Sequence, residues 1–338
     1  MSPRLKPLDQ QTLVITGASS GIGLATARMA ARAGARVFLI ARNAQALASI
    51  CEDLVTRGAQ AAFAVADVGD EAQLRSAADA ARRRFGAIDS WINVAGVAIY
   101  APLLETPTHE HERLFRTNYW GVVNAARIAI PTLGQTGGAF ITVGSVVSDI
   151  GTPILGAYAA SKHAVKGFLD SLRIELIGEK SPVSITLIKP SGIGTPLAEH
   201  AANHMGAAAR IPPPAYAPDV VARTILHAVR HPRREITVGG VGLFQTLAAA
   251  HIPGLSDWVS SLIPPLLKDD KRPAPTRDNL DLPGQDGETR SPHDPSRAFS
   301  LYTDANLHPL VTFGVAALLT SAGLALAAAL RPGRRRPH

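Results

Sequence analysis

The chain has 338 residues, of which 46% are hydrophobic and 5% aromatic, so it can bury a core of small aliphatic side chains in one large α/β domain with an appendage, or in two domains. Its single cysteine, Cys51, excludes an internal disulfide, and no His/Cys cluster has ligand spacing, so we expect no bound metal. The net charge of +7 does not predict nucleic-acid binding, because the basic residues are scattered outside residues 331–336. The N-terminus lacks the apolar run of a secretory signal, which predicts a cytoplasmic domain.

Short apolar runs alternate with helical patterns from residue 12 to about residue 239. Strands that are apolar throughout and separated by helices indicate a parallel sheet covered on both faces. Residues 10–240 are therefore predicted to form an α/β dinucleotide-binding catalytic domain with a doubly wound, Rossmann-like parallel sheet of about seven strands. The predicted strands are TLVIT (12–16), RVFLI (36–40), AAFAVA (61–66), IDSWINVA (88–95), GAFITVGS (138–145), VSITLIK (183–189) and EITVGG (235–240).

The first predicted strand leads into the sequence TGASSGIG, residues 16–23, which opens a helix. Gly17 permits a tight turn, Gly21 lets the backbone approach a pyrophosphate, and Gly23 allows the helix to pack closely on the strand. The free amides at the helix N-terminus then face the phosphates. The spacing differs from the G-x-G-x-x-G of many dinucleotide sites, and a structural turn is the alternative, but the place between strand and helix favours nucleotide binding.

The end of the second strand indicates which nucleotide is bound. A carboxylate there would bind the ribose 2′-hydroxyl, whereas an arginine can pair with a 2′-phosphate. The strand ends with Arg42 and Asn43 and has no carboxylate. This favours NADP(H) over NAD, the alternative being an arginine that merely faces solvent.

A tyrosine and a lysine stand four residues apart in YAASK, residues 158–162, and Ser145 ends the fifth predicted strand. Positions four apart share one face of a helix, so Tyr158 and Lys162 can point at one ligand. A free tyrosine has a pKa of about 10 and transfers protons poorly at neutral pH unless a nearby ammonium stabilises the phenolate. Singly, each residue could be structural. Together with the glycine-rich sequence they predict a proton-transfer site, with Ser145 bonding a carbonyl oxygen.

These motifs, with Asp67-Val68, NVAG at 93–96 and Asn118, occur in the order and spacing of the short-chain dehydrogenase/reductase (SDR) family, which residues 10–240 resemble. The resemblance implies that Asn118 seats a water chain leading from Lys162 and that Thr195 contacts the nicotinamide. Val94 and Ser191 depart from the family pattern. The expected catalytic residues are Asn118, Ser145, Tyr158 and Lys162. The expected cofactor-binding residues are Gly17, Ser19, Ser20, Gly21, Ile22, Gly23, Arg42, Asn43, Asp67, Val68, Asn93, Ala95, Gly96, Tyr158, Lys162, Pro190, Gly192, Ile193 and Thr195.

The alternation of strands and helices stops after Gly240. Residues 241–267 are apolar but are interrupted by prolines and Asp257, which predicts a membrane-surface or substrate-covering segment. Residues 268–309 are rich in charge, proline and glycine, and are predicted to be a flexible polar linker.

Residues 310–330 contain no charged residue and are long enough, at about 1.5 Å per residue, to cross a bilayer as a helix. We predict a C-terminal extension with a transmembrane helix, followed by a basic tail, residues 331–338. A buried or dimer-forming helix is the alternative. A lone anchor would carry the basic tail away from the cytosol, against the usual preference, so the topology is left open. A location at the cytosolic face of a membrane is expected.

These features predict an NADP(H)-dependent oxidoreductase that transfers a hydride between nicotinamide and a carbonyl or secondary alcohol. The apolar segment and the predicted anchor suggest a lipophilic small-molecule substrate. A non-catalytic, membrane-tethered NADP-binding regulator and an epimerase or dehydratase on the same scaffold are the alternatives. Family members pair through the helices predicted here at 107–131 and 156–178, so a homodimer or homotetramer is expected.

Overall fold

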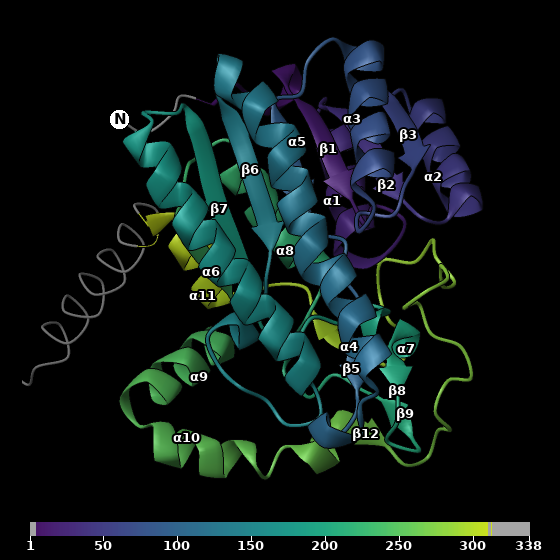
Figure 1. Cartoon of the computed structure of the whole chain (residues 1–338), viewed down its shortest axis with the longest axis vertical. Helices are drawn as coiled ribbons and strands as arrows, with labels where there is room; N and C mark the ends of the chain where they lie inside the picture. Colours follow the sequence, from purple (N-terminus) through teal and green to yellow (C-terminus); the bar gives the residue numbers. More distant parts are fainter. Residues whose placement is uncertain (1–4, 310–311, 313–338) are drawn as a thin grey trace, which may run out of the picture.

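Seven parallel strands form the central sheet of the computed structural model, which describes residues 5–309 and 312 (Figure 1). The strand order is β11-β7-β6-β4-β1-β2-β3, and each neighbouring pair is parallel. The predicted doubly wound α/β fold and its seven strands are therefore confirmed. The strands are β1 (Thr12–Thr16), β2 (Arg36–Ala41), β3 (Ala61–Val65), β4 (Ser90–Asn93), β6 (Gly138–Val143), β7 (Val183–Pro190) and β11 (Glu235–Val238).

Helices cover both faces of the sheet, and each face has its own apolar core. The helices α1 (Gly21–Arg32), α2 (Ala44–Thr56) and α8 (Pro218–Ala228) pack on one face. The helices α3 (Glu71–Phe85), α5 (Gly121–Thr136) and α6 (Gly156–Gly178) pack on the other, at the front in Figure 1. The chain runs outward in both directions from β1 and β4, and in open α/β sheets a ligand crevice forms at the carboxyl ends of strands where the order reverses.

The two long helices predicted on one face are present. The first consists of α4 (Thr108–Phe115) and α5, joined through a π-helical turn, Arg116–Trp120; the second is α6. Such π turns inside helices occur frequently at functional sites. This one contains Asn118, which the sequence assigns to the catalytic set.

The apolar segment after β11 forms a pair of short helices, α9 (Gly240–His251) and α10 (Pro253–Ser260), at the carboxyl end of the sheet (Figure 1). Pro253 is the first residue of α10, where its missing N–H costs nothing, so the proline starts a second helix instead of breaking one. Within residues 5–309, every helix is too short or too polar to cross a membrane. The transmembrane helix expected at 310–330 and the tail at 331–338 lie, apart from Thr312, outside the described residues.

Residues 268–309, expected to be a flexible linker, lie against the domain in the structure (yellow-green in Figure 1). Two short strands of this segment pair with strands of the domain, and such main-chain pairing cannot be predicted from amino-acid composition. The helix α11 (Leu301–Leu307) then packs Leu307 into the core. The pairs are β12 (Lys268–Asp269) with β9 (Ala208–Ala209), and β13 (Ser296–Arg297) with β10 (Ala215–Tyr216). A third pair, β5 (Ile99–Tyr100) with β8 (Ala202–Asn203), and the short helix α7 (Leu197–His200) lie beside them.

Candidate active site

A cavity of about 540 Å³ lies at the carboxyl ends of the central strands and extends to α9 and α10. Most of the residues predicted from the sequence line it. The exceptions are Gly23, Asn43, Asn93 and Asn118, which stand behind its wall. The predicted residues on the wall are Gly17, Ser19, Ser20, Gly21, Ile22, Arg42, Asp67, Val68, Ala95, Gly96, Ser145, Tyr158, Lys162, Pro190, Gly192, Ile193 and Thr195.

The glycine-rich loop between β1 and α1 is packed too tightly for larger residues. Gly17 has a φ of +65°, and a Cβ added there would lie 2.7 Å from the backbone of Ala95. A Cβ on Gly23 would lie 2.0 Å from the carbonyl oxygen of Gly17, which forces glycine at this point of α1. Thr195 faces the same loop, since its side chain is 3.4 Å from the Cβ position of Gly21. Backbone therefore lines this end of the cavity, next to the amides at the start of α1.

Asp67, after β3, is held by two groups. Its Oδ1 accepts a hydrogen bond from the amide of Gly69 at 2.8 Å, and its Oδ2 accepts one from Nη2 of Arg113 at 2.7 Å. Burial raises the pKa of Asp67, but the Gly69 amide and the Arg113 guanidinium outweigh it, so the pKa is lowered overall. Asp67 is therefore a fixed carboxylate, and Arg113, which sequence reasoning missed, keeps it charged.

Two of the predicted asparagines serve the fold directly. Asn43 is the N-cap of α2, where its side chain accepts a hydrogen bond from the amide of Ala46. Asn93 accepts from the indole of Trp91 and donates to Thr142 on β6, which ties β4 to its neighbour. These bonds explain why both side chains stand outside the cavity wall.

Val94 stands where the family pattern has asparagine, and the backbone contact at this position is kept. The amides of Val94 and Ala95 both donate to the Thr16 hydroxyl, at 3.2 and 3.3 Å. Because these bonds come from the main chain, the change of side chain leaves the turn against β1 in place.

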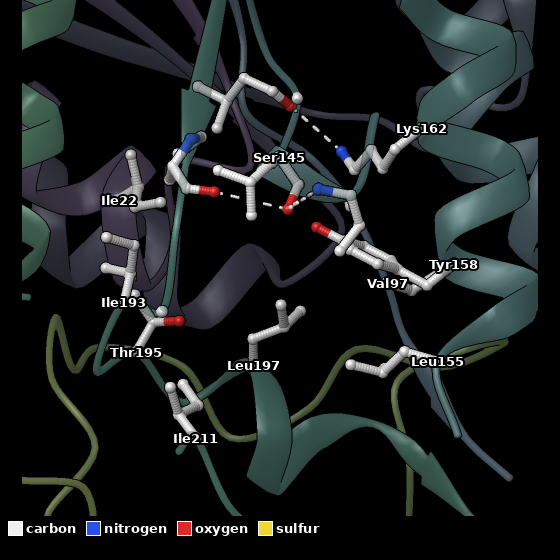
Figure 2. Close-up of a pocket in the computed structure, with 18 of the residues that line it drawn as sticks. Ile22, Val97, Ser145, Leu155, Tyr158, Lys162, Ile193, Thr195, Leu197 and Ile211 are labelled. Atoms are coloured by element: carbon white, nitrogen blue, oxygen red, sulfur yellow. Dashed lines mark hydrogen bonds between the residues drawn. The ribbon is translucent and has the colours of Figure 1, made fainter. Parts of the chain in front are cut away.

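Ser145, Tyr158 and Lys162 converge at the centre of the cavity, where their side chains point toward one another (Figure 2). Ser145 follows β6, whereas Tyr158 and Lys162 lie one turn apart on α6. Nζ of Lys162 donates to the carbonyl of Val143 at 3.1 Å and lies 5.4 Å from the ring centroid of Tyr158. The spacing in YAASK therefore places both side chains on one face, beside the end of β6.

Burial dominates the acid–base properties of this pair in the cofactor-free structure. It raises the pKa of Tyr158 to about 12, against a smaller lowering by the hydrogen bond with Ser145. It lowers the pKa of Lys162 to about 8. The phenol is therefore protonated at neutral pH, which is the state that a proton donor requires.

Asn118 lies behind the catalytic side chains. Its Oδ1 accepts a hydrogen bond from the amide of Val97 at 2.9 Å, and its Nδ2 donates to the carbonyl of Val97 and to Oγ of Ser161, both at 3.0 Å. A Cβ added to Gly96 would lie 3.4 Å from Oδ1 of Asn118 and 3.7 Å from Nζ of Lys162. Asn118 thus fastens the π-helical turn to the segment after β4, close to the lysine.

The segment after β7 closes the cavity on the side of Ser145. The Ser145 hydroxyl lies 3.4 Å from the carbonyl of Pro190, and Gly192 accepts a backbone hydrogen bond from Tyr216 at 2.8 Å. Ser191 also departs from the family pattern. Its hydroxyl is buried and has no hydrogen-bond partner within the described residues.

The apolar wall of the cavity comes from α9 and α10. Phe244, Ala248, Ile252, Leu255 and Val259 line it. The helix pair therefore forms one wall of the cavity, and both readings of residues 241–267, a membrane-surface or a substrate-covering segment, stay predictions.

Residues 279–291, here called the C-terminal loop, form an outer wall that the sequence did not predict. Asn279, Pro283, Gly284 and Asp286 line the cavity. Nη1 of Arg42 donates to two carbonyl groups of the loop and its Nη2 donates to a third. Composition gave no signal of this contact, because the acceptors are main-chain oxygens.

A dinucleotide fits the groups that this cavity offers. The backbone of the glycine-rich loop provides the close approach that a pyrophosphate needs, beside the first turn of α1. The amide of Gly21 in that turn already donates to the carbonyl of Glu288. Oδ1 of Asn279, at the opposite wall, is buried and lacks a hydrogen-bond partner within the described residues. An acceptor in that state is suited to a donor group of a bound nucleotide.

Comparison with known proteins gives the family. Residues 11–206 match the family model of the short chain dehydrogenase. The chain is 38% identical over 324 residues to YxnA of Bacillus subtilis, described as an uncharacterized oxidoreductase, with 94% of this chain and 91% of that protein covered.

Two solved structures are similar over most of their length. A short chain dehydrogenase/reductase from Burkholderia phymatum in complex with NAD aligns with a TM-score of 0.67 and 26% identity, over 74% of this chain and 96% of that one. An alcohol dehydrogenase from the archaeon Thermococcus sibiricus, complexed with 5-hydroxy-NADP, aligns with a TM-score of 0.60 and 25% identity, over 68% and 95%.

The chain belongs to the short-chain dehydrogenase/reductase family. It is an oxidoreductase of the kind that acts on alcohols and ketones, and its fold binds a nicotinamide cofactor.

Proposed function

We propose that this oxidoreductase reduces a lipophilic aldehyde or ketone with NADPH, or oxidises the corresponding alcohol with NADP⁺, using Tyr158 as the proton-transferring residue. The observation that carries the proposal is the convergence of Ser145, Tyr158 and Lys162 in one cavity whose far end is the glycine-rich loop. A binding protein without catalysis has no need for a buried lysine beside a tyrosine, since burying an ammonium group costs free energy.

The nicotinamide, when bound, supplies the hydride to the carbonyl carbon. Ser145 donates a hydrogen bond to the carbonyl oxygen and stabilises the negative charge that develops on it. Tyr158, whose raised pKa keeps it protonated at neutral pH, gives the proton of its hydroxyl to that oxygen. The phenolate that remains is stabilised by the ammonium of Lys162, whose Nζ the Val143 carbonyl fixes beside the Tyr158 ring. Asn118 acts as a positioning residue behind Lys162.

The preference for NADP(H) rests on Arg42 at the end of β2. Its guanidinium has five N–H donors, of which three bond carbonyls of the C-terminal loop, so two remain for a 2′-phosphate. Burial lowers the pKa of Arg42, and the carboxylates of Asp67, Asp286 and Asp281 act in the opposite direction. The same carboxylates repel a phosphate, so we expect a preference of about tenfold rather than a complete exclusion of NAD(H).

The proposal of a lipophilic substrate rests on α9 and α10. Both helices line the cavity with apolar side chains and expose others to the outside: Leu247 on α9 is 49% exposed and Trp258 on α10 is 62% exposed. A large exposed apolar patch on a protein surface indicates a partner or a lipid surface. We propose that this helix pair rests on a membrane at the cytosolic face and that the substrate enters from the lipid.

Self-association is proposed through α5 and α6. Ile174 and Ile177 on α6 are 68% and 70% exposed, and Trp120 at the start of α5 is 53% exposed. Burial of such side chains is favourable, at about 25 cal/mol for each Å² of apolar surface. A homodimer or homotetramer would bury them, which sedimentation of the chain with Ile174→Glu would test by the loss of the larger species.

The experiment that tests the function follows the loss of NADPH absorbance with full-length protein and a series of aldehydes and ketones of increasing chain length. We expect turnover that increases with chain length. A non-catalytic NADP-binding regulator would bind NADPH tightly and convert no member of the series, and an epimerase or dehydratase would convert substrate without net consumption of NADPH.

A further inference from the structure

The C-terminal loop is anchored at both ends to one part of the molecule. The amide of Asn279 donates to the carbonyl of His200 at 2.8 Å, and the amide of Ser291 donates to the carbonyl of Gly194 at 3.1 Å. Both acceptors belong to the segment that follows β7. The chain thus leaves this segment and returns to it, and the residues between form a loop with closely anchored ends.

Between its anchors, the loop reaches the phosphate end of the cavity. The carbonyl of Glu288 accepts a hydrogen bond from the amide of Gly21, and the amide of Gly287 donates to the carbonyl of Ser19, both at 2.9 Å. Ser19 and Gly21 belong to the glycine-rich loop on β1, whereas the anchors lie beyond β7. The C-terminal loop therefore joins the segment after β7 to the glycine-rich loop and lines the cavity beside them.

Arg42 holds the first half of the loop. Its guanidinium donates to the carbonyls of Asn279, Leu280 and Asp281, and Oδ1 of Asp281 in addition accepts a hydrogen bond from Nε of Arg113 at 3.0 Å. Hydrogen bonds from charged donors are stronger than neutral ones. Two arginines of the nucleotide-binding half thus fix a segment in which Asp281 lies 239 residues after Arg42 and 168 residues after Arg113.

Leu280 supplies an apolar anchor. It is 3% exposed and packs in a cluster with Val97, Ile99 and Leu114, whereas Leu282, two residues further on, is 73% exposed. Burial of a leucine side chain stabilises a contact by removing apolar surface from water. The loop is therefore bound to the domain by a buried side chain as well as by hydrogen bonds.

We propose that the C-terminal loop is the outer wall of the cofactor site and that the bound dinucleotide leaves only when this loop opens. The cavity remains open beneath the loop, so a closed loop covers the site without filling it. The loop bonds Ser19 and Gly21 of the glycine-rich loop and Arg42 after β2, which are residues of the proposed cofactor site. Its opening therefore determines the residence time of the cofactor. The proposal rests on nicotinamide-cofactor binding and holds for NADPH and NADH alike.

The first test replaces residues 281–289 of the full-length chain with a short Gly-Ser linker, which keeps Leu280 and both anchors. Dissociation rate constants of NADPH and NADH are measured by stopped-flow fluorescence. We expect both to rise about tenfold or more, because affinity differences of one site appear mainly in dissociation. Leu280→Ala is expected to raise them as well, and Leu282→Ala, its matched control, to leave them unchanged.

A second measurement uses the unaltered protein. Hydrogen exchange of the amides of Gly21, Gly287 and Ser291 is followed with and without saturating NADPH. We expect slower exchange with cofactor, because opening of the loop then requires loss of the contacts it makes to the ligand. Unchanged exchange at all three amides would overturn the proposal even if the linker variant did not fold.

Two results with the variants would also overturn it. Unchanged dissociation of both cofactors from the linker variant would mean that the loop does not retain them. Faster association with unchanged dissociation would mean that the loop obstructs an empty site. Neither result concerns the proposed reaction, which fails separately if the unaltered protein binds NADPH with the expected kinetics and reduces no carbonyl compound.

Discussion

Nζ of Lys162 lies 5.4 Å from the centre of the Tyr158 ring, one helical turn further along α6, and the lysine is buried. The carbonyl of Val143 at the end of β6 accepts its hydrogen bond. A buried ammonium with a single protein acceptor is costly unless its charge is used. The buried ammonium of Lys162 therefore lowers the stability of the folded protein, and the same ammonium stabilises the Tyr158 phenolate in the proposed reaction.

Replacement of Tyr158→Phe is expected to lower kcat by about 10²- to 10⁴-fold, because the proton donor is lost. NADPH affinity is expected to change little, since the ring and its packing remain. Turnover and a fluorescence titration with NADPH measure the two effects. Normal turnover in the variant would show that another group, or water, delivers the proton.

Replacement of Lys162→Met is expected to stabilise the cofactor-free protein at pH 7 by about 3 kcal/mol. The pKa of Lys162 falls from 10.5 to about 8 on burial, so below pH 8 both folded and unfolded states carry the proton and the folded state bears the full cost of burying it. As the pH rises from 8 toward 10.5, the folded state releases the proton first and the free energy of unfolding increases.

Urea unfolding between pH 7 and pH 9 measures this effect, below the pH of about 10 at which tyrosines ionise in the unfolded chain. The increase should disappear in Lys162→Met and persist in Lys180→Met, an exposed lysine just after α6. If the wild-type protein shows no increase over this range, Lys162 is solvated or paired in solution.

Replacement of Arg42→Ala is expected to weaken NADPH binding about tenfold more than NADH binding, because only NADPH has a 2′-phosphate for the remaining guanidinium donors. Both cofactors should also dissociate faster, since Arg42 holds the C-terminal loop. Titrations of both cofactors give the ratio of the dissociation constants. Arg32→Ala, at the exposed end of α1, is the control. An unchanged ratio would mean that Arg42 serves the loop alone.

The strands and the central site were predictable because their signals are local. The runs from residue 12 to residue 240 are apolar throughout, as buried parallel strands must be, and Tyr158 and Lys162 share a helix face by spacing alone. Gly23 could be read in the same way, because it meets the backbone of Gly17, six residues earlier, whereas the close contact of Gly17 with Ala95 joins two distant parts of the chain.

The C-terminal loop could not be predicted, because its partners are main-chain atoms. Arg42 bonds the carbonyl of Leu280, 238 residues away, and every residue has such a carbonyl. Its composition resembles a linker, and only Leu280 and Ser291 are buried in it. Likewise, the sequence around Asn43 and Asn93 does not distinguish a cofactor-binding asparagine from a structural one. In the structure Asn43 caps α2, and Asn93 bridges β4 and β6.

The apolar wall of the cavity predicts how the enzyme distinguishes substrates. Leu255→Ala on α10 shortens a side chain that lines the cavity. We expect KM to rise about tenfold for long-chain carbonyl substrates and little for short ones, because a lost apolar contact weakens only a ligand that reaches it. Steady-state kinetics over the chain-length series measures the change. An equal change in KM for short and long substrates would mean that the alkyl chain of the substrate does not contact Leu255.

The outer face of the same helices predicts contact with lipid. Trp258 and Leu262 are 62% and 59% exposed, and neither lines the cavity. Apolar side chains at a lipid surface bind in proportion to their buried area, so Trp258→Ser with Leu262→Ser is expected to reduce vesicle binding about tenfold or more. Flotation with phosphatidylcholine vesicles measures binding, and kcat with a short soluble aldehyde should be unaltered, since neither side chain lines the cavity that contains Tyr158. The double variant leaves residues 310–338 in place, so undiminished flotation would assign membrane contact to a part of the chain other than α10.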